Sequence, residues 1–488
     1  MSNKPSPLSG FPEWLPTERI AEQQVLDTLR EVFELHGFAP IQTRAVEPLD
    51  QLLRKGETSK EVYVLRRLQA DPEQSAGDAG VGLHFDLTVP FARYVLENAG
   101  RLEFPFRRYQ IQKAWRGERP QEGRYREFTQ ADIDIVGRDE LGFHHDVEVA
   151  RVMAEAMAAL PVPPMRLQVN NRKLIQGFYA GIGIRDVEAA MRVIDKIDKV
   201  SRDTVTTMLL EDAGLSEEQA AQCLRLAEIR CSDTSFVDRV RALGVHNDQL
   251  EEGLVELAAV LEGCASVTGD RVTVEADLRI ARGLDYYTGT VFETSMDGFE
   301  SLGSICSGGR YDSLASDGRV TYPGVGISLG ISRMLVPLLA AGRLSASRSV
   351  PSAVLVALVD EDSRGASDAV AGRLRARGIA AEVAAAPQKF GKQIRYAERR
   401  GIPFVWFPGA GDAAGTHQVK DIRSGDQSDA DPDRWEPPAD DTRPRVVSTG
   451  STTRSTGSTT RSTGSTTRSA GSTTRSTTSS TDTEEQNQ

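Results

Sequence analysis

The sequence predicts an α+β protein: an antiparallel sheet flanked by helices and interrupted by a helical module, then a small α/β domain and a tail. Three observations lead to this prediction. After residue 37, short strand patterns follow one another without regular alternation with helices. Residues 172–262 are helical in pattern almost throughout. Beyond residue 352, strand and helix patterns alternate, which implies a mostly parallel sheet.

Composition and charge restrict the function classes. The chain has 488 residues, 70 acidic and 58 basic, and its formal net charge of -12 argues against a protein that coats nucleic acids regardless of sequence. Its four cysteines share no CxxC spacing and signal neither a disulfide framework nor a metal site. No apolar run reaches the roughly 18 residues of a membrane span, and MSNKPSPLSG lacks the apolar core of a signal peptide. We therefore expect a soluble, cytoplasmic protein.

The first element is an amphipathic helix from about Thr17 to His36, and Gly37 is placed to end it. Its apolar side chains form one stripe that would pack on a core: Ile20, Val25, Leu29, Val32 and Phe33. This helix opens a larger domain that we expect to span 1–345, with the helical module at 172–262 as an insertion.

Residues 82–95 place Asp86 and Thr88 where a strand passes into a helix. With Pro90 in the first turn, one interpretation is that Asp86 caps the helix. The other is that the carboxylate and the hydroxyl bind an ammonium group. Both interpretations stay open at this point.

Residues 106–137 alternate with period two at both ends, around a charged loop that contains glycine and proline. This pattern predicts a long antiparallel hairpin. Its polar residues share one face: Gln110, Gln112 and Arg116 on the first strand, Gln130, Asp132 and Asp134 on the second. That face is either a polar floor with fixed donors and acceptors or a solvated outer surface. The loop adds cations suited to phosphate, namely Arg119, Arg124 and Arg126.

Residues 276–294 read as a strand that breaks at Arg282–Gly283 and resumes after Thr288. Adjacent residues of a strand point to opposite faces, so we expect one of Tyr286 and Tyr287 to face a cleft. An ordinary bulged strand is the alternative.

Two glycine-containing segments follow. By itself, 306–314 reads as a turn, with two glycines before Arg310, Tyr311 and Asp312. Residues 322–339 read as a glycine-spaced strand or turn that runs into a buried helix carrying Arg333. Their glycine spacing is not the dinucleotide fingerprint, and the chain contains no GxxxxGK[ST] phosphate loop. A metal cluster at His144, His145, Asp146 and Glu148 is less favoured than a solvated helix start.

A second domain is expected at 346–427, with buried strands at 354–359, 379–385 and 402–407 and arginine-rich helices between them. We expect 428–488 to be a linker and tail. Asp426 to Pro444 is rich in Asp and Pro, and STGSTTR then recurs with period seven from 448. The repeat contains no aliphatic residue that could form a coiled-coil seam, which predicts disorder.

In this order, the motifs resemble histidyl-tRNA synthetase, a class II aminoacyl-tRNA synthetase, over about residues 10–427. The most specific are RGLDYYTGTVFE (282–293), SGGRYD (307–312) and RGERPQEGRYREFTQADIDIVG (116–137), with NNRKLI (170–175) and FGKQIRYAERRGIPFV (390–405) in addition. The resemblance implies a class II catalytic sheet with a helical insertion and a C-terminal α/β anticodon-binding domain. It also implies ATP-dependent activation of L-histidine to histidyl-adenylate, transfer to the tRNA for histidine, and a homodimer. Mg²⁺ would be held mainly by ATP oxygens plus a carboxylate.

The resemblance also implies roles for individual residues. Arg116 and Arg282 would be catalytic, and together with Arg333 they would bind ATP. Histidine would be bound by Asp86, Thr88, Gln130, Asp134, Tyr286, Tyr287 and Tyr311. Adenylation needs positioning and cationic stabilisation rather than a strong base, which suits arginines at separate points of the chain.

Three departures from the family pattern stand out. Arg44 occupies a position where the family usually has proline, Ser332 one where an acidic residue is common, and the usual C-terminal helix is not evident after 427. Two alternatives are weighed: a non-catalytic histidine-binding paralogue that regulates histidine biosynthesis, and an adenylating enzyme whose acceptor is not tRNA. The regulatory paralogue is disfavoured by the presence of Arg116, Arg282 and Arg333. The enzyme with another acceptor is disfavoured by the arginine-rich second domain.

Overall fold

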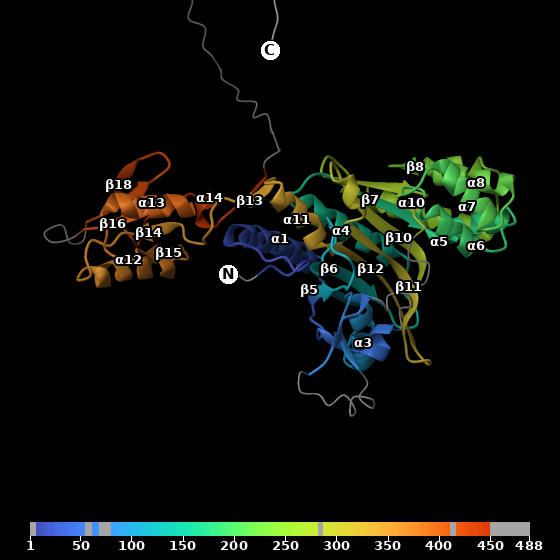
Figure 1. Cartoon of the computed structure of the whole chain (residues 1–488), viewed down its shortest axis with the longest axis horizontal. Coiled ribbons are helices and arrows are strands. Elements are labelled where there is room, and N and C mark those ends of the chain that lie inside the picture. The colour runs from blue at the N-terminus through green and yellow to red at the C-terminus, as the bar shows by residue number, and fades with distance from the viewer. Residues whose placement is uncertain (1–5, 54–60, 68–79, 282–285, 410–415, 449–488) are drawn as a thin grey trace, which may run out of the picture. The chain divides into compact units, whose positions relative to one another are not determined.

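The computed structural model describes residues 6–53, 61–67, 80–281, 286–409 and 416–448 (Figure 1). In these ranges no helix is both long and apolar enough to cross a bilayer. The repeat tail and the Arg282–Gly283 break lie outside the described residues.

The main element of the larger domain is a mixed sheet. Nine strands of the described residues form it, in the order β1 (Ala39–Pro40), β5 (Phe106–Trp115), β6 (Glu127–Val136), β12 (Thr321–Gly330), β11 (Cys306–Ser316), β10 (Tyr287–Met296), β7 (Met165–Asn171), β9 (Val272–Asp277) and β8 (Arg230–Cys231). Pairings from β5 to β7 are antiparallel, while β1–β5 and β7–β9 are parallel. The predicted antiparallel sheet is thus confirmed for the central strands.

The hairpin predicted at 106–137 is confirmed as β5 and β6. The turn predicted at 306–314 is wrong, because this segment is strand β11, paired with β10 on one side and β12 on the other. Glycines weaken an isolated strand, but they are tolerated where another backbone approaches closely. A Cβ on Gly308 would lie 2.1 Å from the carbonyl oxygen of Gly326, which explains glycine inside this strand.

The apolar core lies on one side of the central strands. Odd-numbered β6 residues such as Ile133 and Ile135 join it, as do Phe33, Met153 and Leu335. These last three come from helices that lie along the sheet (Figure 1): α1 (Pro16–Leu35), α4 (His144–Ala159) and α11 (Ile331–Ala340). Since successive strand residues alternate between faces, the even-numbered β6 residues are directed away from this core.

The region predicted to be helical, 172–262, is confirmed as a helical insertion between β7 and β9. It contains α5 (Arg172–Gly181), α6 (Val187–Ile194), α7 (Arg202–Glu211), α8 (Glu217–Ala227), α9 (Phe236–Arg241) and α10 (Asp248–Cys264). Five of these helices are capped at the N-terminus by the side chain of Asn, Asp or Ser, and one of the five, α8, has a full capping box between Ser216 and Gln219. Strand β8 interrupts the helical pattern and pairs with β9.

A small sheet and two helices lie beside the polar side of the main sheet. The sheet consists of β2 (Val46–Pro48), β4 (Val81–Leu83) and β3 (Val64–Leu65), and the helices next to it are α2 (Leu49–Leu52) and α3 (Thr88–Asn98). Phe91 and Val95 of α3 pack with Val136 and Tyr322 of the main sheet. This packing holds the start of α3 close to the central strands.

The second domain contains a five-stranded sheet in the order β15 (Ala381–Val383), β14 (Val354–Val356), β16 (Phe404–Pro408), β17 (His417–Asp421) and β18 (Gln427–Asp429), with α12 (Arg364–Ala376) and α13 (Phe390–Arg400). The three predicted strands are parallel, but β17 and β18 are antiparallel. The sheet is therefore mixed rather than mostly parallel.

The prediction of a linker at Asp426 to Pro444 is also wrong. Trp435 packs its ring at 5.2 Å from Phe404 and 5.6 Å from Trp406. After α14 (Ala439–Thr442), β19 (Val446–Ser448) pairs antiparallel with β13 (Leu344–Ala346). Prolines and aspartates dominate the local composition, but one tryptophan buries enough apolar surface to anchor the segment.

Candidate active site

The polar face of the hairpin is buried. Arg108 is paired with Asp134 in the strand register, Gln110 with Asp132, and Gln112 with Gln130. Asp132 is 2% exposed and Asp134 4% exposed. The alternative of a solvated outer surface is therefore wrong, and these side chains form a polar floor.

Asp134 lies at the centre of this floor. The Tyr311 hydroxyl donates to its Oδ1 at 2.8 Å, and the Arg108 guanidinium pairs with its Oδ2 at 2.6 Å. Burial, and then the neighbouring carboxylate, raise the pKa of Tyr311 well above its usual value, so this phenol remains a donor. Sequence reasoning missed Arg108, although it has the same parity as Gln110 and Gln112. Fully buried, Arg108 also lies over the Phe91 ring at 4.2 Å.

The two adjacent tyrosines do not lie on opposite faces. Their ring centroids are 4.2 Å apart, because Tyr286 precedes β10 and only Tyr287 belongs to the strand. Tyr287 is paired with Tyr311 in the register of β10 and β11. Burial, and then Tyr286, raise the pKa of Tyr287 well above its usual value, so the Tyr287 phenol keeps its proton.

Glycines make room for these side chains. A Cβ on Gly326 would lie 2.1 Å from Asp134 Oδ1, and one on Gly324 would lie 2.5 Å from the Tyr311 ring. A Cβ on Gly309 would lie 2.9 Å from the Tyr287 ring. The glycine spacing in β11 and β12 is thus a requirement of the site.

Two cavities meet on the sheet and share Ser307 and Ser328. The first, of about 20 Å³, is enclosed by Thr88, Asp132, Asp134, Tyr287, Ser307, Gly308, Tyr311, Gly326, Ile327 and Ser328. The second, of about 110 Å³, is lined by Arg116, Glu118, Gly123, Arg124, Tyr125, Phe128, Gln130, Ser304, Ile305, Cys306, Ser307, Ser328, Gly330 and Arg333. The first cavity thus gathers two carboxylates and two phenols, and the second gathers three guanidinium groups together with Glu118 and Tyr125, with two serine hydroxyls shared between them.

Asp86 and Gln130 hold local structure at the edge of these cavities. Asp86 Oδ1 accepts a hydrogen bond from the Val89 amide at 3.0 Å, so the capping interpretation is confirmed. Gln130 Nε2 donates to Ser328 Oγ at 2.6 Å, and its buried Oε1 has no hydrogen-bond partner among the described residues. Thr88 lines the first cavity directly.

Two of the three arginines that line the second cavity are held by backbone oxygens. Arg116 donates from Nε to the Phe85 carbonyl at 3.1 Å and lies 5.0 Å over the Phe128 ring. Arg333 donates from Nε to the Leu302 carbonyl at 3.1 Å, and its Nη2 also contacts that oxygen. Such anchoring orients each guanidinium before any anion arrives. Arg282 lies outside the described residues, so its predicted place stays a prediction.

Comparison with known proteins agrees with this geometry. The family model for histidyl-tRNA synthetase matches residues 10–334. The chain is 59% identical over 450 residues to the histidine–tRNA ligase of Cutibacterium acnes, covering 91% of this chain and 99% of that one. It is 61% identical over 458 residues to the Micrococcus luteus histidine–tRNA ligase, covering 92% and 99%. The chain belongs to the histidyl-tRNA synthetase family.

A solved structure of the family shows the same fold. The crystal structure of histidyl-tRNA synthetase from Nostoc sp. PCC 7120 matches with a TM-score of 0.78 at 34% identity, covering 88% of this chain and 97% of that one. The model for an anticodon binding domain matches residues 353–435. That match includes Trp435, which agrees with its packing against the second sheet.

Two departures from the histidyl-tRNA synthetase pattern have a structural role here. Arg44 donates from Nε and Nη2 to Glu47 Oε2 at 3.2 and 3.0 Å, and the buried Glu47 also pairs with Arg93 at 2.8 Å. Ser332 is buried, and its Oγ accepts from the Thr129 amide at 2.9 Å. Ser332 therefore ties α11 to the back of β6.

No metal centre is evident in the described parts of the chain, where no group of three or more His, Cys, Asp or Glu side chains could hold an ion. His145 Nδ1 lies 2.9 Å from Glu148 Oε2 within the first turn of α4. Burial lowers the pKa of His145, which keeps the imidazole neutral near pH 7. The pair therefore belongs to a helix start, but the prediction that this start is solvated is wrong, because His145 is 4% exposed and Asp146 is fully buried.

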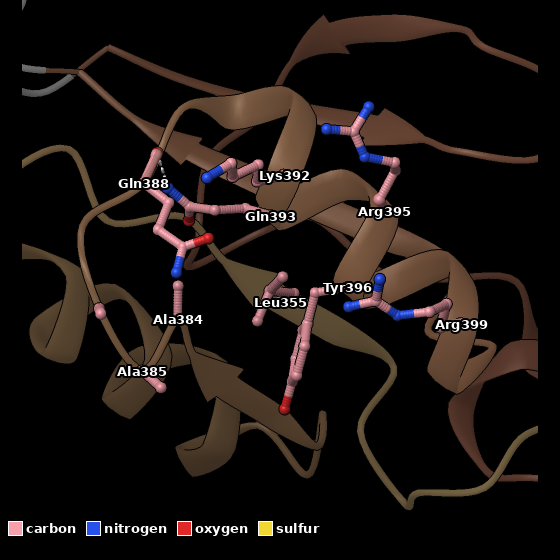
Figure 2. Close-up of a pocket in the computed structure, with 10 residues that line it drawn as sticks. Leu355, Ala384, Ala385, Gln388, Lys392, Gln393, Arg395, Tyr396 and Arg399 are labelled. Atoms are coloured by element: carbon pink, nitrogen blue, oxygen red, sulfur yellow. Dashed lines mark hydrogen bonds between the residues drawn. The ribbon is translucent and has the colours of Figure 1, made fainter.

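The anticodon-binding domain has a cationic cavity of its own, of about 390 Å³ (Figure 2). Lys392, Arg395, Tyr396 and Arg399 follow one face of α13 at helical spacing, and all four line it. Gln393 fixes the base of the cavity, since its Nε2 donates to the Leu358 carbonyl at 2.8 Å and the Gln388 carbonyl at 2.6 Å. Lys392, Arg395 and Arg399 are exposed, so the rim offers three cations to a polyanion.

Proposed function

We propose that this chain is a histidine–tRNA ligase that activates L-histidine with ATP and transfers it to the 3′ end of its tRNA. The observation that carries the proposal is the junction of two cavities at Ser307 and Ser328. One is rich in carboxylate and phenol, and the other is lined by arginines. An amino acid in the first cavity would present its carboxylate, through the junction, to a nucleotide phosphate in the second.

The groups that line the first cavity suit the imidazole of histidine, and its free volume of about 20 Å³ would have to widen to admit the ring. Asp134 and Tyr287 would read the ring nitrogens, while Tyr311 holds Asp134 in place and closes the pocket beside Tyr286. Asp86, Thr88 and Gln130 would hold the α-ammonium group. A site that hydrogen-bonds both ring nitrogens leaves buried polar groups unpaired when another amino acid enters, so discrimination of about 10⁴–10⁵ is attainable without hydrolytic proofreading.

Activation itself requires little acid–base chemistry. The ionised carboxylate of histidine attacks the α-phosphorus of ATP, forming an O–P bond while the bond to pyrophosphate breaks. Arg116 would clamp the carboxylate and the α-phosphate, Arg282 would stabilise the charge that develops there, and Arg333 would lie along the triphosphate. Orientation by fixed guanidinium groups lowers the barrier because the groups need not reorganise during the reaction.

Mg²⁺ would accompany ATP as its counterion and neutralise phosphate charge. The absence of a ligand cluster among the described residues fits an ion held mainly by nucleotide oxygens. Among the residues lining the second cavity, Glu118 carries a carboxylate that could contribute a ligand.

The rim of Lys392, Arg395 and Arg399 would bind the tRNA backbone, with Tyr396 available for stacking on a base. A homodimer follows from the family resemblance. It is also supported by Val46, Val64 and Val81, exposed apolar residues of the small sheet that a second copy could cover. We expect this activity in the cytoplasm, where tRNA, ATP and histidine are available.

Amino-acid-dependent exchange of labelled pyrophosphate into ATP, run across all twenty amino acids without tRNA, tests the activation step. Exchange with histidine alone is expected. A folded protein that binds histidine without exchange would favour the regulatory paralogue, whereas exchange without subsequent charging of tRNA would favour another acceptor. Steep weakening of tRNA binding with rising salt would further argue for the RNA partner.

A further inference from the structure

Asp132 is a buried carboxylate that the roles above leave unused. It lies on β6 between Gln130 and Asp134, on the same polar face, and it lines the first cavity. The side chain is 2% exposed, yet its Oδ1 has no hydrogen-bond partner among the described residues. An unsatisfied buried carboxylate oxygen is costly, so a polar partner in the cavity would relieve a real penalty.

The charges around Asp132 do not neutralise its carboxylate. Arg108 approaches its Oδ2 only to 4.0 Å, because the same guanidinium pairs with Asp134 at 2.6 Å. Asp86 contributes further negative charge, and both Asp134 and Asp86 disfavour the ionised form of Asp132. A cation that entered the cavity at this point would be attracted by two aspartates that share one arginine.

The order of residues along the cavity indicates which part of an amino acid this cation is. Asp134, Tyr287 and Tyr311 occupy the end proposed for the ring, while Ser307 and Ser328 mark the junction through which the carboxylate must pass. Asp132 is paired with Ser328 in the register of β6 and β12. It therefore lies at the level of the substrate Cα, together with Thr88.

We propose that Asp132 is a further histidine-binding residue, whose Oδ1 accepts a hydrogen bond from the α-ammonium group of bound L-histidine. The proposal rests on the proposed function, because it assumes histidine in the first cavity. Asp132 would then share the ammonium with Thr88 and the other residues proposed for it, which directs the substrate carboxylate toward the junction.

The test measures equilibrium binding, by calorimetry, of three ligands to the full chain and to Asp132→Asn. L-histidine and histidinol both carry the ammonium, whereas 3-(imidazol-4-yl)propionate lacks it. We expect Asp132→Asn to raise Kd about 10- to 100-fold for the first two ligands and less than about 3-fold for the third, as loss of a charged hydrogen bond predicts. Asp277→Asn is the matched control, since Asp277 is buried on β9 of the same sheet but lines neither cavity.

Equal weakening of all three ligands, or no weakening of any, would overturn the proposal in favour of a ring contact or a purely structural role. If Asp132→Asn does not fold, Asp132→Ser answers the same question. Failure of the proposed function is distinguishable, because then the unmodified chain binds no histidine and shows no histidine-dependent pyrophosphate exchange.

Discussion

Tyr311 donates a hydrogen bond to Asp134 across 2.8 Å, although the two residues are 177 positions apart in the chain. Strand β12 makes this contact possible, because it lies between β6 and β11 and carries glycine at the positions paired with Asp134 and Tyr311. The Asp134 carboxylate and the Tyr311 phenol thus face each other across glycines of β12, which carry no side chain between them. The proposed histidine specificity depends on this arrangement.

Tyr311→Phe should weaken histidine binding without affecting ATP. The substitution removes one charged hydrogen bond from Asp134 but keeps the ring that fills the pocket, so KM for histidine should rise about 10-fold. Steady-state pyrophosphate exchange with each substrate varied in turn measures this effect. An equal rise in KM for ATP would show that the residue acts on both cavities.

Gly326→Ala should abolish most activity. Its new Cβ would lie 2.1 Å from Asp134 Oδ1, so the carboxylate must move, and a displacement of this size should lower kcat/KM for histidine by about 100-fold or more. Gly372→Ala is the control, because Gly372 is an exposed helical glycine with nothing within 4 Å of an added Cβ. Full activity in Gly326→Ala would contradict the packing described above.

Stability should depend on pH through Asp132. Burial, more than any other cause, raises its pKa from 3.8 to about 7, with Arg108 opposing the shift and Asp134 and Asp86 adding to it. Between these values the folded state keeps a proton that the unfolded state has lost, so the free energy of unfolding falls as pH rises from about 4 to about 7.

Asp132→Asn should remove this pH-dependent fall in the free energy of unfolding. We expect the stability of the variant relative to the parent to increase between pH 5 and pH 8 by at most about 3 kcal/mol, because about two pH units separate pH 5 from the folded-state pKa. Denaturant unfolding at both pH values measures the difference between the two proteins. Asp146, whose burial raises its pKa to about 6, is present in both and cancels. A difference that does not change with pH would exclude this role of Asp132.

The segment that ends at β19 should be required for stability, while the repeat after it should not. A chain that ends at 448 retains Trp435 and the pairing of β19 with β13, and we expect its aminoacylation to be unchanged. A chain that ends at 427 loses both and should unfold at a lower temperature. Trp435→Ala should cost about 2–4 kcal/mol through lost packing, which thermal unfolding followed by circular dichroism can detect.

Charge reversal at Arg395 and Arg399 should separate the two half-reactions. The double substitution to Glu should raise KM for tRNA at least 10-fold and reduce the salt dependence of tRNA binding, because fewer phosphate contacts release fewer counterions. Pyrophosphate exchange should stay unchanged, since it needs no tRNA. Arg364→Glu is the control on α12, since Arg364 does not line the cavity. Equal loss of tRNA affinity in the control would indicate a general charge effect.

The elements with regular periodicity could be predicted from sequence. The hairpin of β5 and β6, the helix α1 and the helical insertion all follow from alternation or from an apolar stripe. The strand β11 and the segment around Trp435 could not, because glycines and prolines are poor local signals for structure that neighbouring strands and a single aromatic contact impose. Arg108 was missed for a related reason. Its position on the same strand face as Gln110 and Gln112 could be seen in the sequence, but its pairing with Asp134 could not.

Sequence by itself determined which chemical groups are available: a row of aspartates and glutamines with one parity, arginines at separate points of the chain, and motifs specific enough to identify the family. Only the tertiary structure decided that this row is buried rather than solvated. It also decided that Arg108 neutralises Asp134 better than Asp132, and that two cavities meet at Ser307 and Ser328. Parity fixes the face on which a side chain lies, whereas burial, charge balance and distance depend on which distant strands come to lie beside it.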